Sequence, residues 1–202
     1  MFPDIARDDV FRLETSRLWL RWPRVADAAA IHRYSSKWEV ARMTARIPHP
    51  YPPGEAERFI FAARQANAAG QDLILAIASN RGKREPFGMI SVESRRQERL
   101  TLGYALAPEA WGKGYASEAA RAIVDASFQL TGAVEILASA RLENPASRRV
   151  LEKCGFVHIG TGREGAPARG GMVDVDRFRL ERAVWAQAYG HRTAAVPPTD
   201  AA

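Results

Sequence analysis

The fold of this chain is decided by residues 104–119, YALAPEAWGKGYASEA. These residues finish an apolar strand predicted over 100–106, pass through a short loop with two glycines and open a helix predicted over 114–130. The first amides of a helix have no partner within the helix, and the helix dipole places partial positive charge there. Glycines let an anion approach the backbone closely. The stretch therefore predicts a phosphate cradle, to which Lys113 adds positive charge.

Two common phosphate loops do not fit these residues. The kinase-type loop needs Gly-Lys-Ser or Gly-Lys-Thr at its end, and the dinucleotide fingerprint needs a third glycine where Ser117 stands. A full Gly-x-Gly-x-x-Gly pattern occurs at residues 160–165, but no helix is predicted after it, so we reject it as a phosphate site. The alternative to a phosphate cradle at Gly112 and Gly114 is an ordinary turn with no ligand.

The rest of the chain alternates between strand and helix patterns. Strands are predicted over 11–22, 73–78, 87–94, 100–106, 134–140, 156–160 and 173–180, and helices over 27–36, 54–69, 114–130 and 145–154. We expect a Gly-rich loop over 160–171, a helix cap from Asp27, and a charged hairpin over 95–98. This order predicts one α/β (α+β) domain with a mixed sheet over residues 10–189, followed by a disordered tail over 190–202.

Composition excludes several classes of protein. The 202 residues are 47% hydrophobic and 26% charged, which suits one globular domain. A single cysteine, Cys154, allows no disulfide within the chain. We expect a cytoplasmic protein without a signal peptide, a membrane span or a membrane partner. The net charge of +6 keeps nucleic-acid binding as a disfavoured hypothesis, because basic and acidic residues are interspersed and a multiply phosphorylated cofactor also suits a positive field.

A second segment, residues 141–156 (RLENPASRRVLEKCGF), favours the phosphate-binding interpretation of the glycine loop over an ordinary turn. Together the two segments resemble the GNAT acetyltransferase superfamily, and most closely its ribosomal-protein N-acetyltransferases of the RimJ/RimL type. Four patterns of that type occur in order and span about residues 10–185. They are Glu-Thr-x-Arg-Leu-x-Leu-Arg at 14–21, Gly-Tyr-x-Leu at 103–106, Trp-Gly-Lys-Gly-Tyr-Ala with Glu-Ala at 111–119, and Asn-x-x-Ser with Leu-Glu-Lys-x-Gly-Phe at 144–156.

The resemblance implies a GNAT fold, with a central, mostly antiparallel, splayed mixed sheet flanked by helices. It implies acetyl-CoA as the only cofactor and no metal. The loop amides would bind its pyrophosphate, the strand at 105–107 would pair with the pantetheine arm, and the strand at 134–140 would splay away. The implied cofactor-binding residues are Ala105, Leu106, Ala107, Trp111, Gly112, Lys113, Gly114, Tyr115, Ala116, Ser117, Asn144 and Ser147. Trp111 replaces the Gln or Arg of the wider superfamily, as is usual in the RimJ/RimL branch.

Acetyl transfer to an amine has chemical requirements that the resemblance assigns to side chains. The departing thiolate benefits from a proton donor. Many superfamily members use a Tyr where this chain has Leu151, so the resemblance points instead to Ser147. The alternative is that the Ser147 hydroxyl only binds the cofactor or the backbone.

The amine must also lose a proton before it can attack, because an alkylammonium has a pKa near 10. Relatives often place a Glu two residues before Gly-Tyr, where this chain has Thr101. Glu93 is our candidate base; Glu98 and a water chain are the alternatives. For Glu118 we expect a helix-dipole or packing role.

The sequence thus predicts an N-acetyltransferase that moves an acetyl group directly to a primary amine in a ternary complex. The acceptor is left open among a protein N-terminus, a lysine, a polyamine and an antibiotic, as are a homodimer and acyl groups other than acetyl. The alternative is a non-catalytic CoA-binding regulatory module of the same fold.

Overall fold

The computed structural model describes residues 2–82, 84–96 and 99–189. One eight-stranded sheet has the order β1-β2-β3-β4-β5-β6-β8-β7, antiparallel except between β5 and β6, which confirms the predicted mixed sheet. Its strands are β1 (Arg12–Glu14), β2 (Leu18–Arg21), β3 (Asp72–Ser79), β4 (Pro86–Arg96), β5 (Arg99–Leu106), β6 (Glu135–Arg141), β7 (Val157–Ala166) and β8 (Gly171–Glu181). The helices are α1 (Ala28–Ser35), α2 (Trp38–Ala41), α3 (Glu55–Ala68), α4 (Tyr115–Leu130), α5 (Pro145–Lys153) and α6 (Arg182–Tyr189).

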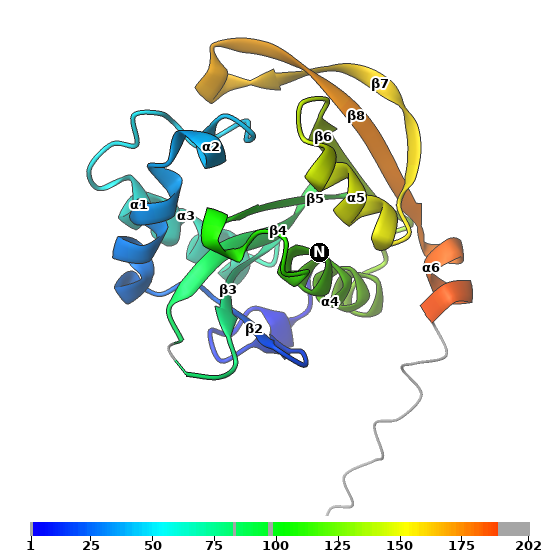
Figure 1. The fold of residues 1–202 in the computed structure, drawn as a ribbon. Coiled ribbons are helices and arrows are strands. Elements are labelled where there is room, and N and C mark those ends of the chain that lie inside the picture. Colours follow the sequence, from blue (N-terminus) through cyan, green and yellow to red (C-terminus); the bar gives the residue numbers. More distant parts are fainter. Residues whose placement is uncertain (1, 83, 97–98, 190–202) are drawn as a thin grey trace, which may run out of the picture.

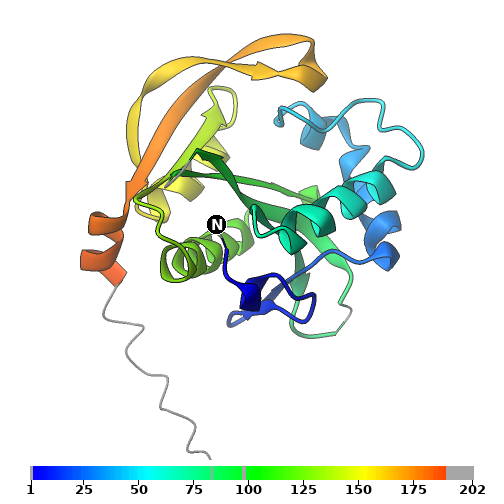
Figure 2. The same cartoon turned by 180° about the vertical axis from the view of Figure 1, so that it is seen from behind.

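Helices cover both faces of the sheet (Figures 1 and 2). Along β4 the side chains alternate between two apolar clusters: Met89 packs in the cluster that includes α1 and α3, whereas Ile90 and Val92 pack in the cluster that includes α4 and α5. We call these sides the α1–α3 face and the α4–α5 face. Because each face has its own core, side chains at successive positions along β4 and β5 lie on opposite faces of the sheet and pack in different cores.

The sheet opens between β5 and β6. Their parallel pairing begins at Arg99 and Glu135 and stops at Leu102 and Ala138, although β5 continues to Leu106 and β6 to Arg141. The predicted splay is therefore present. The last residues of both strands border a slot that runs from one face of the sheet to the other.

The N-terminal strand differs from the prediction over 11–22, because it is a hairpin of β1 and β2. Arg21, which alternation places on the solvent side of a half-buried strand, is only 7% exposed. Its guanidinium makes two hydrogen bonds, of 2.7 and 2.8 Å, to the Asp27 carboxylate. Asp27 also accepts the Arg24 N–H at 2.7 Å and makes no cap bond to α1, so the predicted cap is wrong: the carboxylate is needed by a buried cation.

The predicted Gly-rich loop over 160–171 is also wrong, because β7 runs on to Ala166 and pairs with β8 along its length. This ribbon arches away from the sheet toward α2 (Figure 1). Both faces of β7 are largely exposed, so β7 carries no apolar alternation that sequence could reveal. The Arg177 guanidinium packs over Gly162, where a Cβ would lie 2.6 Å from its central carbon. Only a short 3₁₀ turn, Pro167–Arg169, follows, in agreement with rejecting a phosphate site at 160–165.

The ends of the described chain add two features that sequence did not indicate. Phe2 and Ala6, which precede the expected domain start, are buried in the same core as α4. Helix α6 follows β8 directly, and its Trp185 packs against Phe128. The predicted tail over 190–202 and the tip of the 95–98 hairpin, with Glu98, lie outside the described residues. Within the described part of the chain, none of the helices has the length and apolarity that a membrane crossing requires.

The buried pair of Arg21 and Asp27 should carry a measurable share of the stability. Asp27→Ala leaves a buried guanidinium without its carboxylate, and we expect the free energy of unfolding to fall by about 3–5 kcal/mol in urea denaturation. Arg58→Ala removes a cation that is 63% exposed and paired with Glu55, and should cost less than about 1 kcal/mol. Similar losses in the two variants would contradict this expectation.

Candidate active site

A cleft of about 790 Å³ passes through the slot between β5 and β6. On the α4–α5 face it is bordered by the glycine loop and by the first turns of α4 and α5. On the α1–α3 face it is bordered by α1, α2, residues 42–47 and the exposed side of β3 and β4. A ligand seated in this cleft can therefore reach both faces of the sheet.

The glycine loop presents a row of free amides at the mouth of the cleft. Gly112 and Gly114 adopt φ values of 72° and 78°, in the left-handed region that favours glycine. Within the described residues, the N–H groups of residues 112–117 make no hydrogen bond to the rest of the chain. A Cβ at Gly112 would meet nothing within 4 Å, so the loop is open to a ligand. Free amides at a helix start are the groups that a diphosphate needs, so this geometry is compatible with the predicted cradle.

Trp111 has a different place from the one expected. Its backbone N–H donates to the Pro108 carbonyl at 3.0 Å, so the free amides begin at Gly112. Its indole N–H donates to the Leu106 carbonyl at 2.9 Å. The indole thus satisfies a strand-end carbonyl beside the slot, a structural role compatible with the loss of the Gln or Arg.

The predicted strand segment 105–107 contributes unequally to the slot. Ala107 donates its N–H to the Phe87 carbonyl at 2.7 Å, toward β4. Hydrogen bonding alternates along an antiparallel strand, so the backbone of Ala105 also faces β4, whereas the backbones of Tyr104 and Leu106 face the slot. The Leu106 carbonyl is taken by Trp111, and its N–H is left as a donor to a ligand.

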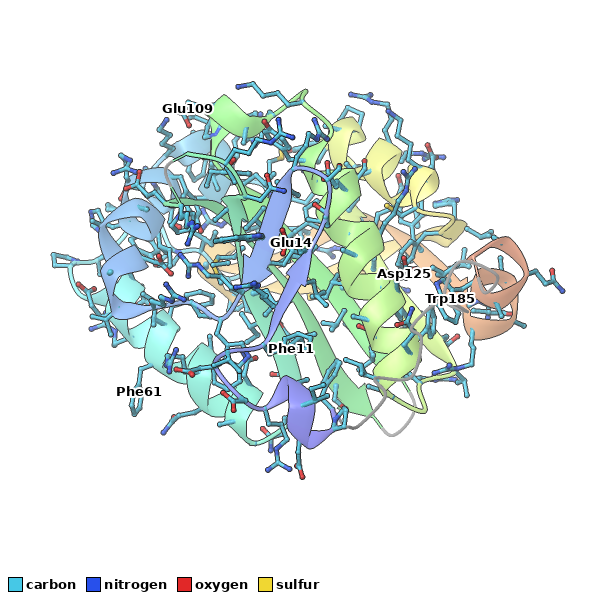
Figure 3. All side chains as sticks on the ribbon, turned by 90° about the horizontal axis from the view of Figure 1, so that it is seen from below. Phe11, Glu14, Phe61, Glu109, Asp125 and Trp185 are labelled. Carbon is cyan, nitrogen blue, oxygen red and sulfur yellow. The ribbon has the colours of Figure 1, made fainter. Side chains whose placement is uncertain are left out.

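A single carboxylate joins the N-terminal hairpin to this loop. Glu118 Oε1 accepts hydrogen bonds from Thr15 Oγ1 at 2.6 Å and from Ser16 Oγ and Arg17 N at 3.0 Å each. Arg17 also donates through Nε to Glu118 Oε2 at 2.6 Å and through Nη1 to the Lys113 carbonyl at 3.0 Å. Partial burial alone would raise the Glu118 pKa, but the bonds from Thr15, Arg17 and Ser16 lower it below its usual value. Sequence reasoning missed this role; Figure 3 shows the β1–β2 hairpin beside α4.

Asn144 and Ser147 lie in the first turn of α5, at the edge of the cleft. Asn144 Oδ1 accepts the Ser147 N–H at 3.0 Å and so caps the helix. The amide nitrogen of Asn144 is therefore left as a donor to a ligand. The Ser147 hydroxyl lies 2.9 Å from the Tyr104 hydroxyl, which also donates to the Ser147 carbonyl at 3.2 Å. Burial raises the Tyr104 pKa well above its usual value, so this phenol keeps its proton near neutral pH.

Tyr104 was not among the site residues predicted from the sequence, although it belongs to the Gly-Tyr-x-Leu pattern at 103–106. The available signal was strand alternation: Tyr104 shares the α4–α5 face of β5 with Leu102 and Leu106. That is the face on which α5 brings Ser147. The pairing of the two hydroxyls could not be seen without the crossing of β5 and α5.

Glu93 lies on the other face, the α1–α3 face, and lines the cleft there. Its cross-strand partner is Thr101, the position at which the family resemblance leads one to expect a Glu. The carboxylate is thus displaced by one strand and stays on the same face. Arg46 binds it through two hydrogen bonds of 2.8 and 2.6 Å, and these bonds raise the Arg46 pKa.

Other reactive side chains are poorly placed for chemistry. Cys154 is 3% exposed, and burial raises its pKa to about 11, so it is a neutral core thiol. Leu151 is 1% exposed and packs in the core beside α4. Across the described residues, no three His, Cys, Asp or Glu side chains are grouped so that they could hold a metal ion.

Comparison with known proteins gives consistent matches. A family model described as acetyltransferase (GNAT) domain matches residues 17–157. The chain is 30% identical over 183 residues to the uncharacterized N-acetyltransferase p20 of Bacillus licheniformis, covering 83% of this chain and 94% of that protein. It is 33% identical over 95 residues to an FsC-acetyl coenzyme A-N(2)-transacetylase of Aspergillus fumigatus, covering 46% of this chain and only 40% of that protein.

A similar solved structure is that of RimL, a ribosomal L7/L12 alpha-N-protein acetyltransferase in complex with coenzyme A. It has a TM-score of 0.74 and 17% identity, over 85% of this chain and 98% of that one. These findings confirm the resemblance seen in the sequence. The chain belongs to the acetyltransferase (GNAT) family, of the RimJ/RimL type, and is an acetyl-CoA-dependent N-acetyltransferase.

Proposed function

We propose that this enzyme passes the acetyl group directly to a primary amine bound on the α1–α3 face of the sheet, within a ternary complex. The observation that carries the proposal is the slot, which connects the free amides of residues 112–117 on one face with Glu93 on the other. Acetyl-CoA supplies the acetyl group as a thioester. The chain's own residues have to position it, stabilise developing charge and move protons.

Backbone groups carry the positioning. The amides of residues 112–117 hold the diphosphate, and the Asn144 amide nitrogen and the open edge of β5 hold the pantetheine arm. The Leu106 N–H is the donor best placed to bind a carbonyl oxygen in the slot. A fixed donor of this kind stabilises an oxyanion as it forms.

Ser147 is the proposed proton donor on the cofactor side. The single proton of the Tyr104 hydroxyl can point to the Ser147 carbonyl or, across 2.9 Å, to Ser147 Oγ; in the second arrangement the serine proton is free to face the slot. Tyr104 then orients the donor without contacting the reacting atoms. This arrangement gives the serine hydroxyl a catalytic use beyond the helix cap, which Asn144 already provides.

Glu93 is the proposed acceptor of the amine proton, directly or through a water. Its carboxylate lies on the α1–α3 face and lines the cleft, so it can attract an incoming ammonium. The two hydrogen bonds from Arg46 keep the carboxylate in place at the cleft.

Thiol release with acetyl-CoA and a panel of primary amines tests the proposal against a non-catalytic CoA-binding module. We expect amine-dependent release above the rate of acetyl-CoA hydrolysis, with the acetylated amine identified by mass spectrometry. Coenzyme A binding without amine-dependent release for any amine of the panel would favour the module.

Gly114 tests the cradle. Gly114→Asp places a carboxylate at the diphosphate site, with its Cβ 3.5 Å from Arg17 Nη2. The like charge, offset in part by Arg17, should raise the Kd for coenzyme A by about 10-fold or more in calorimetry. Gly114→Asn is the matched control, because Asn and Asp tolerate the φ of 78° equally well and only Asp is charged. Equal affinities in the two variants would remove the electrostatic part of the cradle.

Ser147 tests the proton donor. Ser147→Ala should lower kcat by roughly 100-fold, leave the KM for acetyl-CoA nearly unchanged, and cost little stability because Asn144 still caps α5. Tyr104→Phe keeps the ring and loses only the orienting hydroxyl, so its kcat should fall less. Steady-state kinetics separate the roles: a greater loss in Tyr104→Phe than in Ser147→Ala would reverse the assignment.

A further inference from the structure

We infer that the acceptor is a monoamine carried on an apolar body, either an aromatic or branched aliphatic amine or a peptide whose first residue has such a side chain. This inference rests on the proposed function, because it names the substrate class of the same cleft. A polyamine is the acceptor that it excludes. Three features of the α1–α3 face lead to it.

The first feature is an apolar wall. The side chains of the cleft on this face come from the segment after α2, from α3 and from β3 and β4, and behind them Ile31 and Val40 are buried. The half-buried apolar side chains that border the opening are Met43, Ile47, Tyr51, Phe59 and Ile74, with Met89 beneath them. Such a surface gains free energy by covering an apolar body and none by covering a hydrated polycation.

The second feature is the state of the acidic groups. Three carboxylates that line the cleft already have cationic partners: Glu93 with Arg46, Glu143 with Arg141 at 3.5 Å, and Glu164 with Arg177 at 3.2 Å. A fourth glutamate, Glu39, also lines the cleft, from the exposed side of the short helix α2. Arg42, Arg46 and Arg141 line the same end. A second ammonium group on the acceptor would have to compete with guanidinium groups for carboxylates that are already paired, and this discriminates against polyamines.

The third feature is that the wall is held in place. The Ala168 N–H at the tip of the β7–β8 ribbon donates to the Ala45 carbonyl at 3.0 Å. The guanidinium of Arg169 donates to the Ile47 carbonyl, and that of Arg141 to the Arg42 carbonyl. Residues 42–47 are therefore anchored at three carbonyls before any acceptor binds. A preformed apolar wall selects by shape at a small cost in ordering.

The wild-type enzyme tests the inference with acetyl-CoA and three acceptors: phenethylamine, a tripeptide beginning with Phe, and spermidine. We expect kcat/KM for phenethylamine or for the peptide to exceed that for spermidine by about tenfold or more. The first two arms separate a small amine from a polypeptide N-terminus. Equal or better use of spermidine would overturn the inference and leave the proposed function intact, whereas no turnover with any of the three would count against the proposed function.

A matched pair of variants on α3 locates the wall. Phe59 borders the cleft and is half-buried, whereas Phe61 is 65% exposed and projects into solvent (Figure 3). Phe59→Ala should raise the KM for the preferred apolar amine by about tenfold and leave the Kd for coenzyme A unchanged. Phe61→Ala should change neither. If the Phe59 variant does not fold, Met43→Glu serves instead. It should lower the ratio of kcat/KM for the preferred apolar amine to kcat/KM for spermidine, and an unchanged ratio would overturn the inference.

Discussion

The early end of the pairing between β5 and β6 is the constraint on which the rest of this structure depends. After Leu102 and Ala138 the two strands separate. The backbone groups of Tyr104 and Leu106 that point toward β6 therefore have no partner on that strand. Unpaired backbone groups are costly unless something binds them. The Trp111 indole satisfies the Leu106 carbonyl, and the remaining groups are available to a ligand. The interruption of the sheet also joins its two faces, which a continuous ladder would keep apart.

A second constraint keeps the glycine loop in register with this opening. A loop with positive φ at Gly112 and Gly114 and with free amides has few contacts that hold it. Glu118 collects its donors from the turn between β1 and β2, and Arg17 returns from that turn to the Lys113 carbonyl. The opening residues 14–17 and the loop at 111–116 are therefore two parts of one structure. Their occurrence in one sequence has this physical reason, which neither segment reveals alone.

Sequence predicted what local chemistry determines and missed what distant segments determine. The helices at α3, α4 and α5 follow from spacing, caps and glycine, and their observed bounds lie close to those expected. The family patterns implied the splayed sheet, and the glycines before the predicted helix over 114–130 predicted the cradle. The continuation of β7 beyond residue 160 was missed because both faces of β7 meet solvent, so its residues carry no period-two apolar signal, whereas β8 was predicted over 173–180. The bonds of Asp27 to Arg21, of Glu118 to Arg17 and of Tyr104 to Ser147 were missed because each partner is chosen by tertiary contact.

The two departures from the family pattern have a common geometric reading. Leu151 stands where many relatives have a tyrosine on α5. A phenolic hydroxyl nevertheless reaches α5 from β5, because Tyr104 contacts Ser147 in the first turn of that helix. Thr101 stands where many relatives have a glutamate on β5, yet a carboxylate lies beside it on β4, at Glu93. In both cases the side chain comes from the neighbouring element and stays on the face where the proposed chemistry needs it. The slot determines where a hydroxyl or a carboxylate has to lie for the proposed chemistry. Any strand or helix that borders the slot can supply such a group. A pattern defined by chain position records one such solution, so the loss of its residues does not by itself imply the loss of catalysis.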